Sequence, residues 1–114
     1  MKTGTILAIL LNILAVAGCK ERKVVDINML DYSNGLVYEA NSETLFTGKS
    51  VEYWPNGQTS VEIEYLNGTV HGKWIIWHEN GQKEDESKIR EDELISQKCW
   101  NENGDPTPCD QLPL

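Results

Sequence analysis

Apolar and polar side chains alternate one by one through the middle of the chain. Val61, Ile63 and Tyr65 are separated by Glu62 and Glu64. A period of two predicts a β-strand with one packed face and one face in water. The pattern therefore predicts a sheet rather than a helical bundle.

The two segments flanking this strand carry apolar residues on both faces. We expect four residues to share the buried face: Val51, Tyr53, Ile75 and Trp77. Three others then fall on the opposite face: Trp54, Trp74 and Ile76. The segment 73–77 is apolar on both sides, so it is predicted to lie in the covered centre of the sheet or to expose an apolar patch.

Asn-Gly pairs divide the chain at regular intervals. They begin at Asn34, Asn56, Asn80 and Asn103, which are 22, 24 and 23 residues apart, and a fifth pair begins at Asn67. Asn-Gly is a strong hairpin signal because both residues tolerate positive φ. A fixed period of about 20–50 residues is typical of repeat architectures.

The segments 48–58 and 72–82 align without a gap. Each begins with Gly-Lys, has an aromatic residue four positions before the turn glycine, and ends in Asn-Gly-Gln. A third copy is weaker: Trp100 again stands four before Gly104, but Ile95 replaces the leading glycine. The pattern predicts hairpins stacked side by side, each supported mainly by its neighbours.

The third copy is also more charged. Where Val61, Ile63 and Tyr65 stand in one copy, the equivalent positions hold Asp85, Ser87 and Ile89. Residues 84–93 contain six carboxylates, and charge of this kind deters pairing at the end of a sheet. The alternative, a calcium site, lacks the glycine-centred spacing of a calcium loop.

Five segments together resemble a known family, the bacterial MORN-repeat variant, many of whose members are called YwqK-family antitoxins. The segments are 36–38, 46–49, 53–58, 65–74 and 77–83. The resemblance is close over residues 36–83 and poor over 84–105. It implies a mainly β fold, an elongated, twisted, single-layer antiparallel sheet of repeated hairpins. It implies no catalytic residues.

The N-terminus has the features of an export signal. Lys2 precedes an apolar run over residues 6–17 that is interrupted only by Asn12. The run is shorter than the roughly 20 residues of a membrane-spanning helix and fits the apolar core, about 7–15 residues long, of a signal peptide. Residues 16–19, Val-Ala-Gly-Cys, resemble the bacterial lipobox. The resemblance implies a signal helix, cleavage before Cys19, and acylation of the Cys19 thiol.

We therefore divide the chain into a lipoprotein signal peptide (1–18), a lipidated tether (19–30), a repeat domain (31–105) and a C-terminal tail (106–114). The lipid on Cys19 would hold the protein on a membrane of the cell envelope. Lys20 follows the cysteine, which favours the outer membrane in a Gram-negative organism. In a Gram-positive organism the site would be the outer face of the plasma membrane.

Charge and cysteine content restrict the function further. The net charge of −8 argues against nucleic-acid binding, because phosphate backbones are repelled. Outside the cytoplasm Cys99 and Cys109 are a candidate disulfide, the alternative being two free or separately paired thiols. A metal site is not expected, since there is no CxxC pair and His71 and His78 lie far upstream. No cofactor is expected either.

We expect a non-enzymatic protein. A hydrolase needs a nucleophile, a base and an orienting group, whereas His71 and His78 have the settings of turn or surface residues. Trp54, Trp74 and Ile76 are candidates for binding a protein partner, because aromatic residues are favoured as interface anchors. The alternative is that these residues fill a thin sheet.

The sequence thus predicts a membrane-anchored, non-enzymatic binding or scaffold module of the bacterial cell envelope. An antitoxin or immunity protein that neutralises a toxin at the envelope is the alternative. A small envelope hydrolase is a third, less favoured hypothesis.

Overall fold

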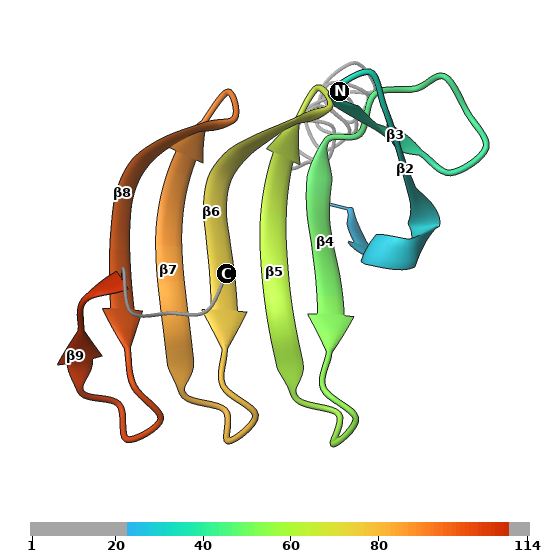
Figure 1. Cartoon of the computed structure of the whole chain (residues 1–114). Coiled ribbons are helices and arrows are strands. Elements are labelled where there is room, and N and C mark those ends of the chain that lie inside the picture. Colours follow the sequence, from blue (N-terminus) through green and yellow to red (C-terminus); the bar gives the residue numbers. More distant parts are fainter. Residues whose placement is uncertain (1–22, 110–114) are drawn as a thin grey trace, which may run out of the picture.

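The computed structural model describes residues 23–109, and the predicted signal helix and Cys19 lie outside this range. The described residues form nine strands and one 3-10 turn, without an α-helix (Figure 1). The elements are β1 (Val24–Asp26), η1 (Ile27–Met29), β2 (Leu30–Ser33), β3 (Leu36–Glu39), β4 (Gly48–Tyr53), β5 (Thr59–Leu66), β6 (Thr69–Trp77), β7 (Lys83–Arg90), β8 (Glu93–Trp100) and β9 (Pro106–Thr107). Within residues 23–109, no helix is long and apolar enough to cross a membrane.

Seven strands form one sheet in the order β1-β4-β5-β6-β7-β8-β9. From β4 to β9 each strand pairs antiparallel with the next one in the sequence, so the sheet is a row of hairpins (Figure 1). The predicted mainly β, hairpin-rich antiparallel fold is confirmed. β1 is the exception, since it pairs parallel to β4.

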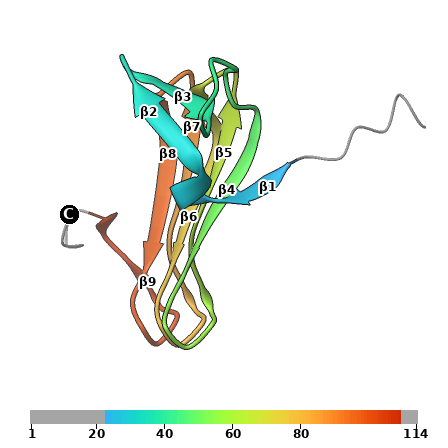
Figure 2. The same ribbon diagram turned by 90° about the vertical axis from the view of Figure 1, so that its right-hand side faces the viewer.

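β2 and β3 form a separate hairpin that lies against one face of the large sheet (Figure 2). Beneath it the core residues Phe46, Ile63 and Tyr65 gather, and Leu30 and Val37 of the hairpin pack on them. Phe46 is only 1% exposed, and its ring meets that of Tyr65 edge to face. The hairpin therefore adds a second layer over one end, which the predicted single-layer sheet did not include.

The folded part extends beyond the predicted domain boundaries on both sides. Residues 24–30, assigned to the tether, contain β1 and η1, and β1 pairs with residues 49–51 of β4. Residues 106 and 107, assigned to the tail, form β9, and Cys109 is bonded to Cys99. The sequence analysis assigned these ends to a tether and a tail, because segments of two or three paired residues carry no detectable alternation.

The predicted distribution of apolar residues over the two faces is confirmed in part: Val51 and Ile75 share one face, and Trp74 and Ile76 lie on the other. Tyr53, predicted to be buried, is 57% exposed. Glu62 pairs with Val51 on one side and with Ile75 on the other, so these three share a face. Ile63 pairs with Trp74, so the packed residues of β5 share their face with Trp74 instead. Period-two alternation defines faces within a strand, but the turns and bulges between strands set the register, and a shift of one residue exchanges the faces.

Val51 and Ile75 are nevertheless buried, at 7% and 8% exposure. Ile75 lines a hollow whose other walls are Lys49, Glu62, Glu64 and Lys73. Long charged side chains cover apolar surface with their aliphatic stems while their heads stay in water. We call this side the charged face and the opposite side, with Ile63 and Trp74, the aromatic face.

The Asn-Gly pairs serve two kinds of turn. Asn34 and Asn67 adopt positive φ, as do the glycines after them, in the two-residue turns that join β2 to β3 and β5 to β6. At Asn56, Asn80 and Asn103 only the following glycine has positive φ, and these turns are longer. The pair at Asn34 therefore belongs to the separate hairpin and is not the first member of the repeat.

Candidate functional site

Three turns of one design lie side by side at one end of the sheet, after β4, β6 and β8 (Figure 1). They span residues 54–58, 78–82 and 101–105. In each, the amide of the first residue donates to the carbonyl of the fifth, at 2.7–2.9 Å. The glycine amide donates to the carbonyl of the first residue, at 2.9–3.0 Å. The repeat seen in the sequence is thus a repeat of turn geometry.

Asparagine side chains connect each turn to the next. Asn56 Oδ1 accepts from an amide of its own turn, and its Nδ2 donates to the carbonyl of Glu79, 2.9 Å away. Asn80 does the same one repeat later, with its Nδ2 2.7 Å from the carbonyl of Glu102. We call this arrangement the turn ladder. It gives a reason for asparagine rather than aspartate at these positions, since only the amide donates to the neighbouring carbonyl.

A ring side chain makes a second connection between the turns. Trp54 Nε1 donates to the carbonyl of Trp77 at 3.0 Å, and His78 Nε2 lies 2.9 Å from the carbonyl of Trp100. Because a carbonyl only accepts, His78 Nε2 is the protonated nitrogen in this contact. Trp54 and His78 thus occupy equivalent positions, and both are used to hold neighbouring turns together.

Both histidines have at least one ring nitrogen engaged in a structural contact. His78 Nδ1 is 3.3 Å from Glu84, which leaves neither of its nitrogens facing an open site. His71 Nδ1 accepts from the backbone amide of Glu91 at 3.4 Å, next to the turn after β7. His78 is the first residue of a turn, as expected, whereas His71, which was expected in a turn, lies within β6.

The three candidate binding residues do not form one group. Trp74 lies on the aromatic face of β6, between Ile63 and Ser87 of the neighbouring strands, and is 36% exposed. Ile76 follows on the same face and is half-buried. Trp54 lies beyond the end of β4, with its indole N–H committed to the turn ladder. Trp74 and Ile76 are therefore the members that share a surface.

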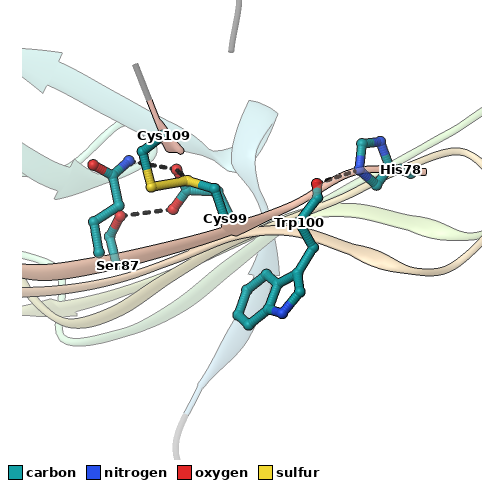
Figure 3. Close-up of a disulfide and its surroundings, with 7 residues drawn as sticks. His78, Ser87, Cys99, Trp100 and Cys109 are labelled. Carbon is teal, nitrogen blue, oxygen red and sulfur yellow. Dashed lines mark hydrogen bonds between the residues drawn. A yellow bond between two sulfur atoms is a disulfide. The ribbon is translucent and has the colours of Figure 1, made fainter. Parts of the chain in front are cut away.

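A polar cluster surrounds the disulfide on the aromatic face of β7 and β8. Cys99 and Cys109 are joined by a disulfide (Figure 3). Asp85, paired with Cys99 across the strands, is only 5% exposed. Its Oδ1 accepts from Ser87 at 2.7 Å and its Oδ2 from Gln97 at 2.5 Å. In the sequence, Asp85 and Ser87 are visible as polar residues at positions where the preceding copy has Val61 and Ile63. This pattern was interpreted as a degraded repeat and did not reveal the cluster.

Two titrating groups have shifted pKa values with clear causes. Burial raises the pKa of Tyr65 above its usual value of 10.0, and the hydrogen bond with Ser50, 3.0 Å long, lowers it in part. On the charged face, a hydrogen bond from Lys83 lowers the pKa of Glu86, and the charges of Lys73 and Lys98 act in the same direction. Both shifts thus follow from contacts within the sheet.

Within residues 23–109, His, Cys, Asp and Glu side chains form no group of three or more suited to a metal ion. Of the acidic segment 84–93, residues 84–90 lie in β7, Glu91 and Asp92 form the turn, and Glu93 begins β8. None of the family models, curated proteins or solved structures compared with the chain matches it.

Proposed function

We propose that the chain is a lipid-anchored, non-enzymatic binding or scaffold module of the bacterial cell envelope, built from MORN-like repeats. The observation that carries the proposal is the position of Trp74. A large aromatic side chain, 36% exposed, lies on β6, the fourth of seven strands, where a sheet normally has its most protected residues. Exposed aromatic residues with apolar neighbours are typical of protein interaction sites.

The anchor part of the proposal rests on the lipobox resemblance at residues 16–19. Val24, the first residue of β1, is only five positions after Cys19 in the sequence. At about 3.6 Å per extended residue, this segment spans no more than about 18 Å. A lipid on Cys19 would therefore keep the sheet beside the membrane, and a partner would be bound there.

The contacts of both histidines support a non-enzymatic role. A general base must reach the proton that it removes, and His78 is held by Trp100 and Glu84 while His71 accepts from the backbone. The acidic composition favours a partner with a basic surface. An antitoxin or immunity protein is a special case of the same activity, with one toxic partner.

The test combines labelling with site-specific cross-linking in membranes. We expect a clickable fatty acid to label the wild-type chain but not Cys19→Ala; label retained by the variant would refute the anchor. A photo-cross-linking amino acid at position 74 should give one discrete protein adduct. At position 88, an exposed position on the charged face, it should give none.

The two positions then decide whether the aromatic face binds a partner. The same adducts at both positions, or none at position 74, would contradict the binding proposal. Identification of the adduct as a toxin whose toxicity this chain relieves would select the antitoxin alternative. Any other single envelope protein would favour the scaffold role.

A further inference from the structure

The disulfide sulfur of Cys99 lies against a buried carboxylate. Cys99 Sγ is 3.6 Å from Asp85 Oδ2, and the two residues are 4% and 5% exposed. A disulfide sulfur carries no hydrogen, so this contact is not a hydrogen bond and gives the carboxylate no donor. Cys109, the other half of the bridge, is only half-buried.

The hydrogen bonds of Asp85 are those of an ionised carboxylate. Both of its oxygens accept, one from the Ser87 hydroxyl and one from the Gln97 amide. An ionised carboxyl group is an acceptor only, which fits the two donors that it meets here. Asp85 therefore places a negative charge next to the sulfur without a cation to neutralise it among the contacts of the cluster.

We propose that Asp85 protects the Cys99–Cys109 disulfide by slowing thiol–disulfide exchange. An attacking thiolate reaches the more exposed sulfur, that of Cys109, and forms a bond to it while the bond between Cys109 and Cys99 breaks. The electron pair leaves on Cys99 Sγ, which becomes a thiolate 3.6 Å from the Asp85 carboxylate. Two negative charges at this distance in a buried place repel strongly, which makes Cys99 a poor leaving group.

The other direction of attack is closed as well. An attack on Cys99 Sγ would bring an anionic thiolate towards the same carboxylate, at a residue that is only 4% exposed. Because both directions are opposed, the bridge is a long-lived clamp. It closes the segment that contains the last turn of the ladder, 101–105, and β9, so it keeps the final repeat in place.

The test measures the rate of reduction of the disulfide in the folded, full-length chain in detergent. Dithiothreitol is the reductant, its second thiol completes the exchange, and the freed thiols at positions 99 and 109 are counted by alkylation and mass spectrometry. Asp85→Asn, which keeps the shape of the side chain, should raise the rate about tenfold or more. Asp105→Asn removes the same charge from an exposed position in the closed loop and should leave the rate within about twofold.

Two further measurements separate charge from packing. Ser87→Ala loosens the cluster but keeps the carboxylate, so it should change the rate much less than Asp85→Asn. The wild type should react faster with a cationic thiol, cysteamine, than with an anionic one, mercaptopropionate, and Asp85→Asn should reduce this ratio. In concentrated guanidinium chloride, where the chain is unfolded, both proteins should react at the same rate.

Each of these results can overturn the proposal. Equal rates for the folded wild type and Asp85→Asn would remove the protective role of the charge. Equal acceleration by Ser87→Ala would assign the effect to packing. A difference that persists in the unfolded chain would show that the folded contact is not its cause.

Discussion

The replacement Asn80→Asp tests whether the turn ladder stabilises the fold. It keeps Oδ1, which accepts from the amide of Gln82 within the turn. It replaces the Nδ2 donor by an oxygen, which then faces the carbonyl of Glu102 at the former hydrogen-bond distance of 2.7 Å. The change therefore removes the bond between turns and leaves the bond within the turn.

The expected loss follows from this single bond. A net hydrogen bond contributes about 0.5–1.5 kcal/mol, and two facing acceptors add repulsion that water at this exposed site partly relieves. We expect the free energy of unfolding to fall by about 1–2 kcal/mol. For a domain of 60–100 residues each kcal/mol lowers the melting temperature by roughly 4–8 °C. Thermal and urea unfolding followed by circular dichroism measure both quantities.

Asn103→Asp is the matched control. It makes the same change of charge and size in the third turn, where β9 follows and the described residues contain no fourth turn for the amide to reach. Its effect should stay below about 0.5 kcal/mol, the usual range of a surface substitution. If Asn103→Asp destabilises the protein as much as Asn80→Asp does, or if Asn80→Asp is neutral, the ladder does not stabilise the fold in the way argued above.

Three further changes test the core, the edge and the charged face. Ser50→Ala removes the hydrogen bond that lowers the pKa of Tyr65, so this pKa should rise further, as measured by tyrosinate absorbance. In the wild type, the stability that Tyr65 contributes should be lost as the pH rises above 10.0. Gly48→Ala should cost clearly more in chemical unfolding than the roughly 1 kcal/mol of its positive φ, because a Cβ would meet a backbone oxygen beside β1 at 2.6 Å. Lys83→Met removes the hydrogen bond that lowers the pKa of Glu86, so this pKa should rise, as measured by NMR titration of the carboxyl group. In the wild type, the stability that Glu86 contributes is present above pH 4.5, the usual pKa of the group, and is lost as the pH falls below 4.5.

The hairpin arrangement could be predicted because turn chemistry is local. The pairs at Asn56, Asn80 and Asn103 mark the ends of hairpins correctly, since the glycine after each needs a conformation that other residues rarely adopt. The aromatic residue before each turn also lies in an equivalent place. The carbonyls of Trp77 and Trp100 accept from the rings of Trp54 and His78, one turn earlier in the chain. These features depend on a few consecutive residues.

The relation between strands could not be predicted in the same way. Whether Val51 shares a face with Ile63 depends on how many residues the turn 54–58 uses and on a bulge at Glu52 and Tyr53. Alternation alone contains neither quantity. The packing of β2 and β3 over Phe46 depends on contacts between separate hairpins, which a repeat analysis does not include.

The disulfide cluster lies between these two cases. Asp85 and Ser87 were visible as polar residues at positions that are apolar in the preceding copy. Their role requires that Gln97 and Cys99 come to the same place from β8, which only the register of β7 and β8 reveals. A polar residue at an inward position is thus a better sign of a specific contact than of a weakened repeat.

The Asn-Gly turns also determine how fast the protein undergoes asparagine deamidation. In such a pair the glycine nitrogen can attack the side-chain amide carbon of asparagine, ammonia leaves, and hydrolysis of the ring gives aspartate or isoaspartate. The side chains of Asn56 and Asn80 are held at both ends, which restrains this attack. In the third turn the amide of Asp105 donates to Asn101 and not to Asn103, so Asn103 lacks the inner bond as well. Among these three turns, deamidation should therefore begin in the third, where it costs the fold least, and come last in the two that hold neighbouring hairpins together.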